Sequence, residues 1–148
     1  MPPSSSAAFK RPESVLVVVH TTDSVLLLRR VDPPDFWQSV TGSLRWDERE
    51  PIEAARRELR EETGIEEAGR LRDLQLTYRF PILPAWRARY APNVKENTEH
   101  VFSLALQAET DINVNPAEHA EWGWFDFRTA AARVASWTNR EAILKLGS

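Results

Sequence analysis

The hydrophobic residues in the first third of this 148-residue chain fall in short runs that are separated by turn-forming residues. Residues 15–19 form a continuous run of valine and leucine, which predicts a strand buried on both faces of a sheet. Residues 22–24 predict a turn, and residues 25–30 predict a second strand that ends in two arginines. A proline-rich loop at 32–35 leads into residues 36–40, which predict a short third strand. The chain therefore begins with a group of neighbouring strands.

The pattern changes from strand to helix in the middle of the chain. Pro51 stands in the first-turn position that proline tolerates in a helix. Ile52, Ala55 and Leu59 follow at helical spacing and predict one apolar stripe. Gly64 is the expected helix stop, because glycine adopts the left-handed conformation that ends helices.

The second half of the chain predicts more strands, two irregular loops and two closing helices. The predicted strands are 71–82, 98–106 and 122–125, the loops are 81–96 and 113–121, and the helices are 127–134 and 139–146. Strands on both sides of one central helix, with helices at the end, predict an α/β fold in which a mixed sheet is flanked by helices.

Composition narrows the classes of protein and of metal site. The hydrophobic content of 42% and charged content of 28% are typical of a globular domain, and a net charge of −3 argues against a nucleic-acid partner. The chain has no cysteine, so a metal would be held by oxygen or imidazole ligands. No apolar run approaches the roughly 20 residues that span a bilayer, which argues against a membrane partner. We expect residues 1–10 to be a flexible tail without a secretory signal, and 11–148 to be one cytoplasmic domain.

Three glutamates give the central helix its candidate chemistry. Glu58, Glu61 and Glu62 stand at i, i+3 and i+4, so they project from one side of the helix. Like charges at that spacing repel, and the helix dipole disfavours acids in the last turn. A divalent cation bound by oxygen ligands would offset both costs. The alternative is a solvated helix face on which neighbouring arginines screen the acids.

The same stretch resembles the signature of the Nudix hydrolase family. That signature is a glycine, five residues, a glutamate, seven residues, and then Arg-Glu-aliphatic-x-Glu-Glu-x-Gly-aliphatic; its helical half is complete here. Gly42 and Glu48 match the first half, but eight residues rather than seven separate Glu48 from Arg57. The extra residue belongs to the loop or the helix start, so Glu48 and Glu50 both remain candidates for the first glutamate.

The resemblance implies a fold, a metal and a set of roles. The family fold is an α/β/α sandwich, and the family hydrolyses nucleoside-diphosphate-like compounds with Mg²⁺, for which Mn²⁺ can substitute. The resemblance implies that Glu61 and Glu62 hold the metal, together with the backbone carbonyl of Thr41. Glu58 is then a metal ligand or the base that activates water. Arg57 would orient a neighbouring glutamate through a charge-assisted hydrogen bond.

A further acid in this family usually comes from a loop outside the helix. Glu118 fits the common pattern of glutamate and histidine followed by tryptophan, and Glu121 is the second choice. The residues give no preference for His119. His20 and His100 lie in predicted strands, so we expect them to be packed or hydrogen-bonded without a ligand role.

Segments outside the helix resemble the members of the family that act on pterin triphosphates in folate synthesis. They are residues 35–43, residues 89–92 with 97–99, and residues 136–143. The resemblance implies a Mg²⁺-dependent pyrophosphohydrolase that converts dihydroneopterin triphosphate to the monophosphate and diphosphate. A broader hydrolase of nucleoside triphosphates and a binding module without turnover are the alternatives. The oligomeric state stays open.

Aromatic and amide side chains suit a flat polar ring, and basic side chains suit a triphosphate. The expected ring contacts are Trp37, Gln38, Tyr90, Asn97 and Asn139. The expected phosphate contacts are Arg29, Arg79, Arg87, Arg89 and Lys95.

Overall fold

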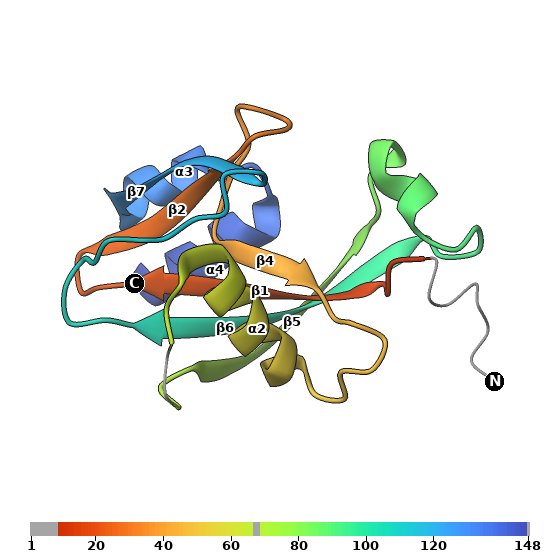
Figure 1. Cartoon of the computed structure of the whole chain (residues 1–148), viewed down its shortest axis with the longest axis horizontal. Helices are drawn as coiled ribbons and strands as arrows, with labels where there is room; N and C mark the ends of the chain where they lie inside the picture. The colour runs from red at the N-terminus through yellow and green to blue at the C-terminus, as the bar shows by residue number, and fades with distance from the viewer. Residues whose placement is uncertain (1–8, 67–68, 148) are drawn as a thin grey trace.

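A mixed seven-stranded sheet forms the centre of the protein, with helices on both of its faces (Figure 1). The computed structural model describes residues 9–66 and 69–147, so most of the expected tail at 1–10 lies outside the described residues. The strands are β1 (Glu13–His20), β2 (Ser24–Arg30), β3 (Trp37–Gln38), β4 (Val40–Ser43), β5 (Arg72–Pro81), β6 (Glu96–Ala105) and β7 (His119–Asp126). The helices are α2 (Pro51–Thr63), the 3-10 helix η1 (Pro84–Arg89), α3 (Phe127–Arg133) and α4 (Trp137–Gly147).

These elements confirm the α/β fold and the order of strands and helices expected from the sequence. Two details differ. The expected loop at 81–96 contains the 3-10 helix η1, and the expected loop at 113–121 is shorter because β7 already begins at His119. No helix within the described residues is long and apolar enough to cross a membrane.

β1 is the central strand, and it is buried on both faces as its sequence predicts. Val15, Val17 and Val19 pack into the core beneath α2, whereas Leu16 and Val18 pack on the opposite side against α3 and α4. β1 runs parallel to β6 and antiparallel to β2 and β4. Both cores therefore depend on this one strand.

Two strands share the same edge of β1. β2 pairs with it only at the far end, where His20 lies opposite Val25. β4 pairs with the first half, where residues 14–17 lie opposite residues 40–43. The sheet thus divides along this edge, and the division brings the glycine that precedes the helical motif, Gly42, beneath α2.

Several aromatic and histidine side chains have structural roles. Trp122 and Trp124 are partly buried against the core beneath α2. His20 Nδ1 lies 2.9 Å from the carbonyl oxygen of Thr21, and His100 Nε2 lies 2.7 Å from Oε2 of Glu13. These contacts confirm the structural roles predicted for His20 and His100.

Asn139 has a structural role that the sequence did not indicate. Its Oδ1 accepts a hydrogen bond from the backbone N–H of Ser39 at 2.8 Å, and its Nδ2 donates to Oγ of Ser39 at 2.9 Å. Both residues are at most 1% exposed. The amide therefore joins α4 to the link between β3 and β4, and we withdraw its assignment as a ring contact.

We expect Asn139→Ala to lower the free energy of unfolding by roughly 1–3 kcal/mol, because the buried N–H of Ser39 loses its acceptor. Urea denaturation would measure the change. The matched control is Arg140→Ala, since Arg140 is the next residue of α4 and is exposed. Equal stability of the two variants would contradict this account.

Candidate functional site

Both ends of α2 are held in a defined conformation. Pro51 occupies the first turn, and the Glu53 carboxylate accepts a hydrogen bond from the backbone N–H of Glu50 at 2.7 Å. Gly64 has a left-handed φ of 77°, and its N–H donates to the carbonyl oxygen of Arg60 at 2.9 Å. These caps, together with the buried alanines and leucine, fix which side of the helix faces the sheet.

Arg57 is the centre of the hydrogen-bond network on α2. Its Nε and Nη2 donate to the two carboxylate oxygens of Glu48, each at 2.8 Å. Nη2 also donates to the carbonyl oxygen of Ser43 at 3.0 Å, and Nη1 donates to Oε1 of Glu58 at 2.8 Å. The bond to Glu48 is the main reason why the pKa of Arg57 is raised. Arg57 therefore joins Glu48 and Glu58 through charge-assisted hydrogen bonds.

Glu48, and not Glu50, is the glutamate that the motif loop presents to the helix. Besides its paired bond to Arg57, Oε1 of Glu48 accepts the backbone N–H of Arg45 at 2.7 Å. The bond to Arg57 is the largest cause of the lowered pKa of Glu48. Glu50 instead lies at the N-cap of α2. The loop absorbs the extra residue without losing this pairing.

Glu58 lies directly over Gly42 of β4. A Cβ atom at position 42 would overlap the carboxyl group of Glu58, so a larger residue would displace this side chain from its present position. Burial raises the pKa of Glu58 to about 7, although the charge of Arg57 acts in the opposite direction. This close approach explains the glycine of the motif.

Glu62 is the most deeply buried acid of the site, with 5% of its surface exposed. Burial raises its pKa well above the usual range, and the negative charge of Glu58 raises it further. The two carboxyl groups share a hydrogen bond, and the backbone amide of Thr41 contributes another to Glu62. Oε1 of Glu62 has no hydrogen-bond partner in the described part of the chain.

His119 lies beside Glu62 and carries no charge. Its Nε2 is 4.0 Å from Oε1 of Glu62 and 3.4 Å from Nε2 of Gln38. Burial, and then the positive charge of Arg30, lower the pKa of His119 to about 4. A neutral imidazole makes no ion pair at this distance, so it does not neutralise Glu62.

Glu61 has a different environment from the other two glutamates. Its side chain is 44% exposed, and it contacts Nη1 of Arg57 and Nη2 of Arg45, each at 3.2 Å. The three acids thus share one side of α2, as the spacing predicts, but only Glu58 and Glu62 are withdrawn from solvent.

An irregularity in the strand pairing brings a fourth acid near the helix. The register of β2 and β7 shifts between Arg29 and Arg30, at the point where β7 begins. The charge of Glu118, just before β7, contributes to the raised pKa of Glu62. Glu121 instead accepts a hydrogen bond from Nε of Arg29 at 2.7 Å. This placement supports Glu118 over Glu121 as the additional acid.

The carboxylates fit a divalent cation bound by oxygen. Glu62 has a buried oxygen without a partner, and Glu58 beside it has a raised pKa, so positive charge is lacking at this point. Within residues 9–66 and 69–147, no three acidic or histidine side chains are grouped closely enough to hold a metal ion by themselves, so water and substrate would have to supply further ligands. Mg²⁺ suits such a site because it usually binds one or two carboxylates and keeps water and substrate oxygens as its other ligands.

Of the expected ring contacts, Gln38 lies at this cluster, whereas Tyr90 and Asn97 contact strands β4 and β1. Gln38 reaches His119, as described above. The pKa of Tyr90 is raised by burial, while a hydrogen bond to Ser43 at the end of β4 acts to lower it. Asn97 is buried and donates from Nδ2 to Oγ of Ser14 at 2.8 Å, and its Oδ1 has no partner among the described residues.

Other expected contacts lie elsewhere. The Trp37 ring packs edge-on against Phe125, with centroids 5.4 Å apart, and lies beneath the guanidinium of Arg133. Trp37 therefore belongs to the core beneath α3 and α4, and we withdraw it as a ring contact. Arg29 is paired with Glu121, and Arg79 is exposed on β5. The remaining basic residues, Arg87, Arg89 and Lys95, are exposed in or after η1.

Two cations near the carboxylates, Lys10 and Arg30, were not among the site residues expected from the sequence. The charges of Arg30 and Glu58 both act on the pKa of Lys10, and Arg30 also acts on that of His119. Arg30 ends β2, and Lys10 lies three residues before β1, positions at which a basic residue is common. Only the folded arrangement of separate segments distinguishes them from other surface cations.

Comparisons with known proteins agree with this geometry. A family model described as the NUDIX domain matches residues 10–146. The dihydroneopterin triphosphate diphosphatase of Escherichia coli (strain K12) is 48% identical over 140 residues, covering 91% of this chain and 91% of that protein. The Haemophilus influenzae protein of the same name is 39% identical, covering 93% of this chain and 88% of that protein. The solved structure of the E. coli dihydroneopterin triphosphate pyrophosphohydrolase has a TM-score of 0.86 at 45% identity, covering 93% of this chain and 96% of that chain.

We expect Glu62→Gln to raise the melting temperature of the protein in chelator at pH 8. A carboxyl whose pKa is raised on folding binds protons more tightly in the folded state, so its contribution to stability falls as pH rises. For Glu58, this loss falls between the usual value of 4.5 and about 7. Removing the neighbouring charge at Glu62 should relieve both groups, and the gain should shrink at pH 5.

Glu61→Gln is the matched control, because it removes the same charge from an exposed side chain that two arginines already neutralise. Its melting temperature should stay equal or fall slightly. A fall for Glu62→Gln at pH 8 would instead show that the buried carboxylate stabilises the metal-free fold.

Proposed function

We propose that this chain, which belongs to the Nudix family, is a Mg²⁺-dependent pyrophosphohydrolase that converts dihydroneopterin triphosphate to dihydroneopterin monophosphate and diphosphate. The observation that carries the proposal is the agreement, over nearly the whole chain, with relatives named for that activity. The buried carboxylate pair on α2 supplies the corresponding chemistry.

The reaction adds water across the bond between the α- and β-phosphates, so one phosphorus–oxygen bond forms and one breaks. A divalent cation at the carboxylates would neutralise phosphate charge and lower the pKa of a bound water. We assign Glu61, Glu62 and Glu118 to hold that cation, with the carbonyl of Thr41 as a further oxygen donor. Glu62 supports this assignment because its unpaired oxygen lacks only a positive partner.

We assign Glu58 as the general base that accepts the proton of the attacking water. Arg57 holds Oε1 of Glu58, while Oε2 lies over Gly42, so the side chain has one oriented position. Arg57 is in turn held by Glu48 and by the carbonyl oxygen of Ser43. This chain of charge-assisted hydrogen bonds positions the proton acceptor before substrate arrives.

For the ring, we assign Gln38, Tyr90 and Asn97. The unpaired Oδ1 of Asn97 can accept a hydrogen bond from an amino group, and Tyr90 provides an aromatic face. Arg87, Arg89 and Lys95 are assigned to the phosphates because they are exposed on one segment, without a rigid structural role.

A substrate panel tests the proposed function. Dihydroneopterin triphosphate, dGTP, dATP and dCTP would be compared by release of diphosphate in Mg²⁺. We expect the pterin to have the highest kcat/KM, and Asn97→Ala to lower its kcat/KM about 10- to 200-fold with a smaller effect on dCTP. A wild-type enzyme that prefers dGTP or dATP would overturn the pterin assignment and favour the broader nucleotide hydrolase.

The role of Glu58 can be separated from that of Glu62 by measuring metal binding and turnover in the same variants. We expect Glu58→Gln to lower kcat by roughly 10²–10⁴-fold, as for loss of a general base, while the Kd for Mn²⁺ changes little. Glu62→Gln should raise the Kd for Mn²⁺ by at least about 10-fold. Isothermal titration calorimetry would give the Kd for Mn²⁺ of both variants. An equal rise of this Kd in the two variants would make Glu58 a metal ligand.

A further inference from the structure

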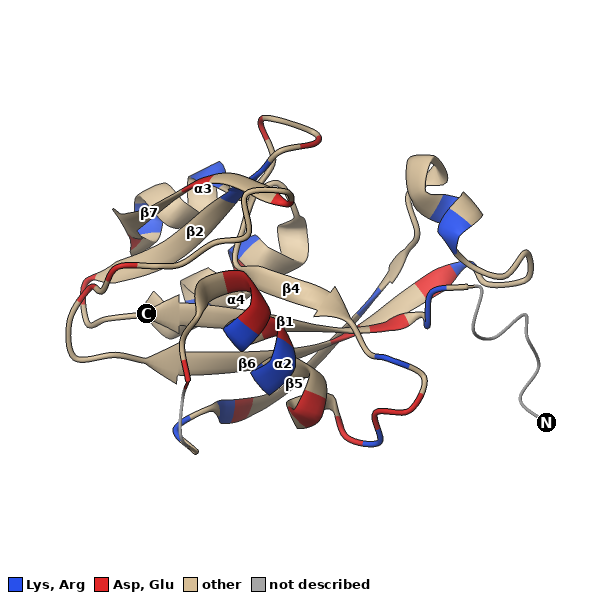
Figure 2. Ribbon diagram, in the orientation of Figure 1, with Lys and Arg blue, Asp and Glu red and all other residues tan. Residues whose placement is uncertain are grey.

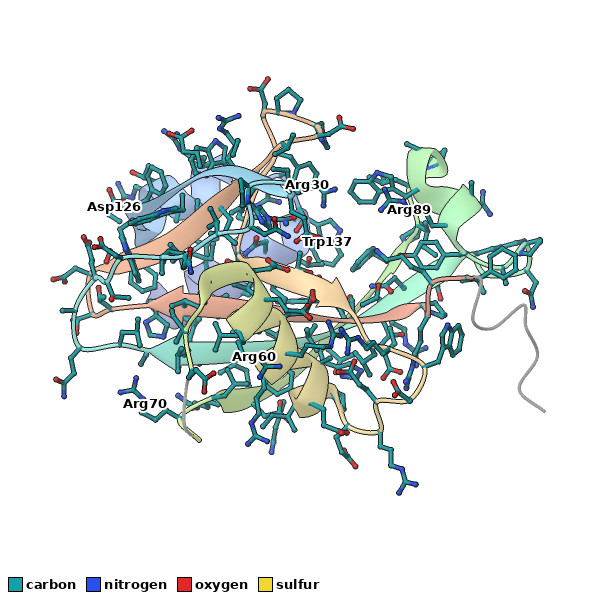
Figure 3. The ribbon with its side chains drawn as sticks, in the orientation of Figure 1. Arg30, Arg60, Arg70, Arg89, Asp126 and Trp137 are labelled. Atoms are coloured by element: carbon teal, nitrogen blue, oxygen red, sulfur yellow. The ribbon has the colours of Figure 1, made fainter. Side chains whose placement is uncertain are left out.

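Three cations from separate segments lie close enough for the charges of Arg30 and Arg89 to act on Lys10. Lys10 precedes β1, Arg30 ends β2, and Arg89 ends η1. The backbone N–H of Lys10 donates to the carbonyl oxygen of Arg89 at 2.8 Å, which joins the two segments directly. Figure 3 places Arg30 and Arg89 on facing segments of the molecule.

An aromatic contact holds the two facing segments together. Nε of Arg30 donates to the carbonyl oxygen of Asp32 at 3.0 Å, and its guanidinium lies 5.8 Å from the centroid of the Phe36 ring. The Phe36 ring lies 5.9 Å from that of Trp86 in η1. η1 carries basic positions and no acidic ones (Figure 2). The position of Arg30 relative to η1 is therefore defined by packing.

These cations are not neutralised by the carboxylate pair. Within the part of the chain that the structure describes, none of the three makes an ion pair with a carboxylate, whereas Arg29 and Arg57 both do. Burial, Arg89 and Arg30 lower the pKa of Lys10, which shows that these positive charges oppose one another. The charge of Glu58 acts on the pKa of Lys10, and the charge of Arg30 acts on the pKa of His119, so these two cations lie close to the site.

We propose that Lys10, Arg30 and Arg89 form a phosphate clamp, which holds the polyphosphate chain of the substrate against the carboxylate cluster. This clamp rests on the proposed function only in that the substrate is a polyphosphate; it does not depend on whether the substrate carries a pterin or a nucleoside. A polyphosphate carries more negative charge than a metal at the carboxylates can neutralise. Like charges held together repel until an anion joins them, so these cations gain most when the phosphates bind.

The clamp is tested with inorganic triphosphate, which has phosphates and no ring. Its inhibition constant would be measured against the best triphosphate substrate found for the wild type, at saturating Mg²⁺. We expect Lys10→Met, Arg30→Gln and Arg89→Gln each to raise that constant roughly 10- to 100-fold, as for loss of a charge-assisted contact. KM for the substrate should rise in parallel, and the inhibition constant should depend less on salt.

Three controls separate a clamp from a general loss of charge or fold. Arg72→Gln removes one positive charge from the exposed start of β5 and should leave the inhibition constant unchanged. Lys10→Arg and Arg89→Lys keep the charge and should recover most of the binding. Unphosphorylated dihydroneopterin, used as a second inhibitor, should bind all variants about equally.

Inhibition constants for triphosphate within about twofold of wild type in all three variants would overturn the clamp. An equal loss for triphosphate and unphosphorylated dihydroneopterin would also overturn it, because the cations would then support the fold of the site. A wild type that prefers nucleotides to pterins would refute the proposed function alone. Inorganic triphosphate tests the clamp whether the wild type prefers pterins or nucleotides.

Discussion

Two glutamates that are buried side by side, Glu58 and Glu62, impose the condition on which the rest of the site depends. Removing a carboxylate from water is costly unless positive charge or hydrogen bonds compensate for it. Arg57 compensates Glu58 and is itself held by Glu48. Glu62 has the backbone amide of Thr41 but a neutral histidine beside it, so its compensation is incomplete. The proposed cation would bind at this point, where the pairing of Glu62 is incomplete.

The sheet supplies this arrangement through the divided edge of β1. Because β4 pairs with the first half of that strand, Gly42 lies under the helix and leaves space for the Glu58 carboxyl group. β2 pairs at the other end and continues to β7, where the shift in register brings His119 toward Glu62. One buried strand, β1, therefore positions both sides of the site, and α2 supplies its three glutamates.

The sequence predicted the features that depend on neighbouring residues. The apolar run of β1, the helix from Pro51 and its stop at Gly64 follow from local periodicity and backbone preference, which do not depend on the remainder of the fold. The choice between Glu48 and Glu50 depended on how a loop with one extra residue closes, and the sequence left it open.

The errors fell on side chains whose partners are distant in sequence. Trp37 and Asn139 look like ring contacts, but the direction of a short strand and the docking of α4 place them in the core. Lys10 and Arg30 went unnoticed because three segments must converge before their charges have a common target. Element order was predictable from the sequence, whereas convergence required the three-dimensional structure.

A metal held at the unpaired oxygen of Glu62, as proposed above, would also link the lifetime of the protein to metal supply. A cation that binds only the folded chain shifts the folding equilibrium by mass action, so loaded molecules open less often than unloaded ones. Proteases act on opened chains, and small differences in stability change cellular abundance several-fold. A cell short of divalent cations would then lose this protein by degradation as well as by inactivity, and the buried carboxylate would act as a quality-control signal.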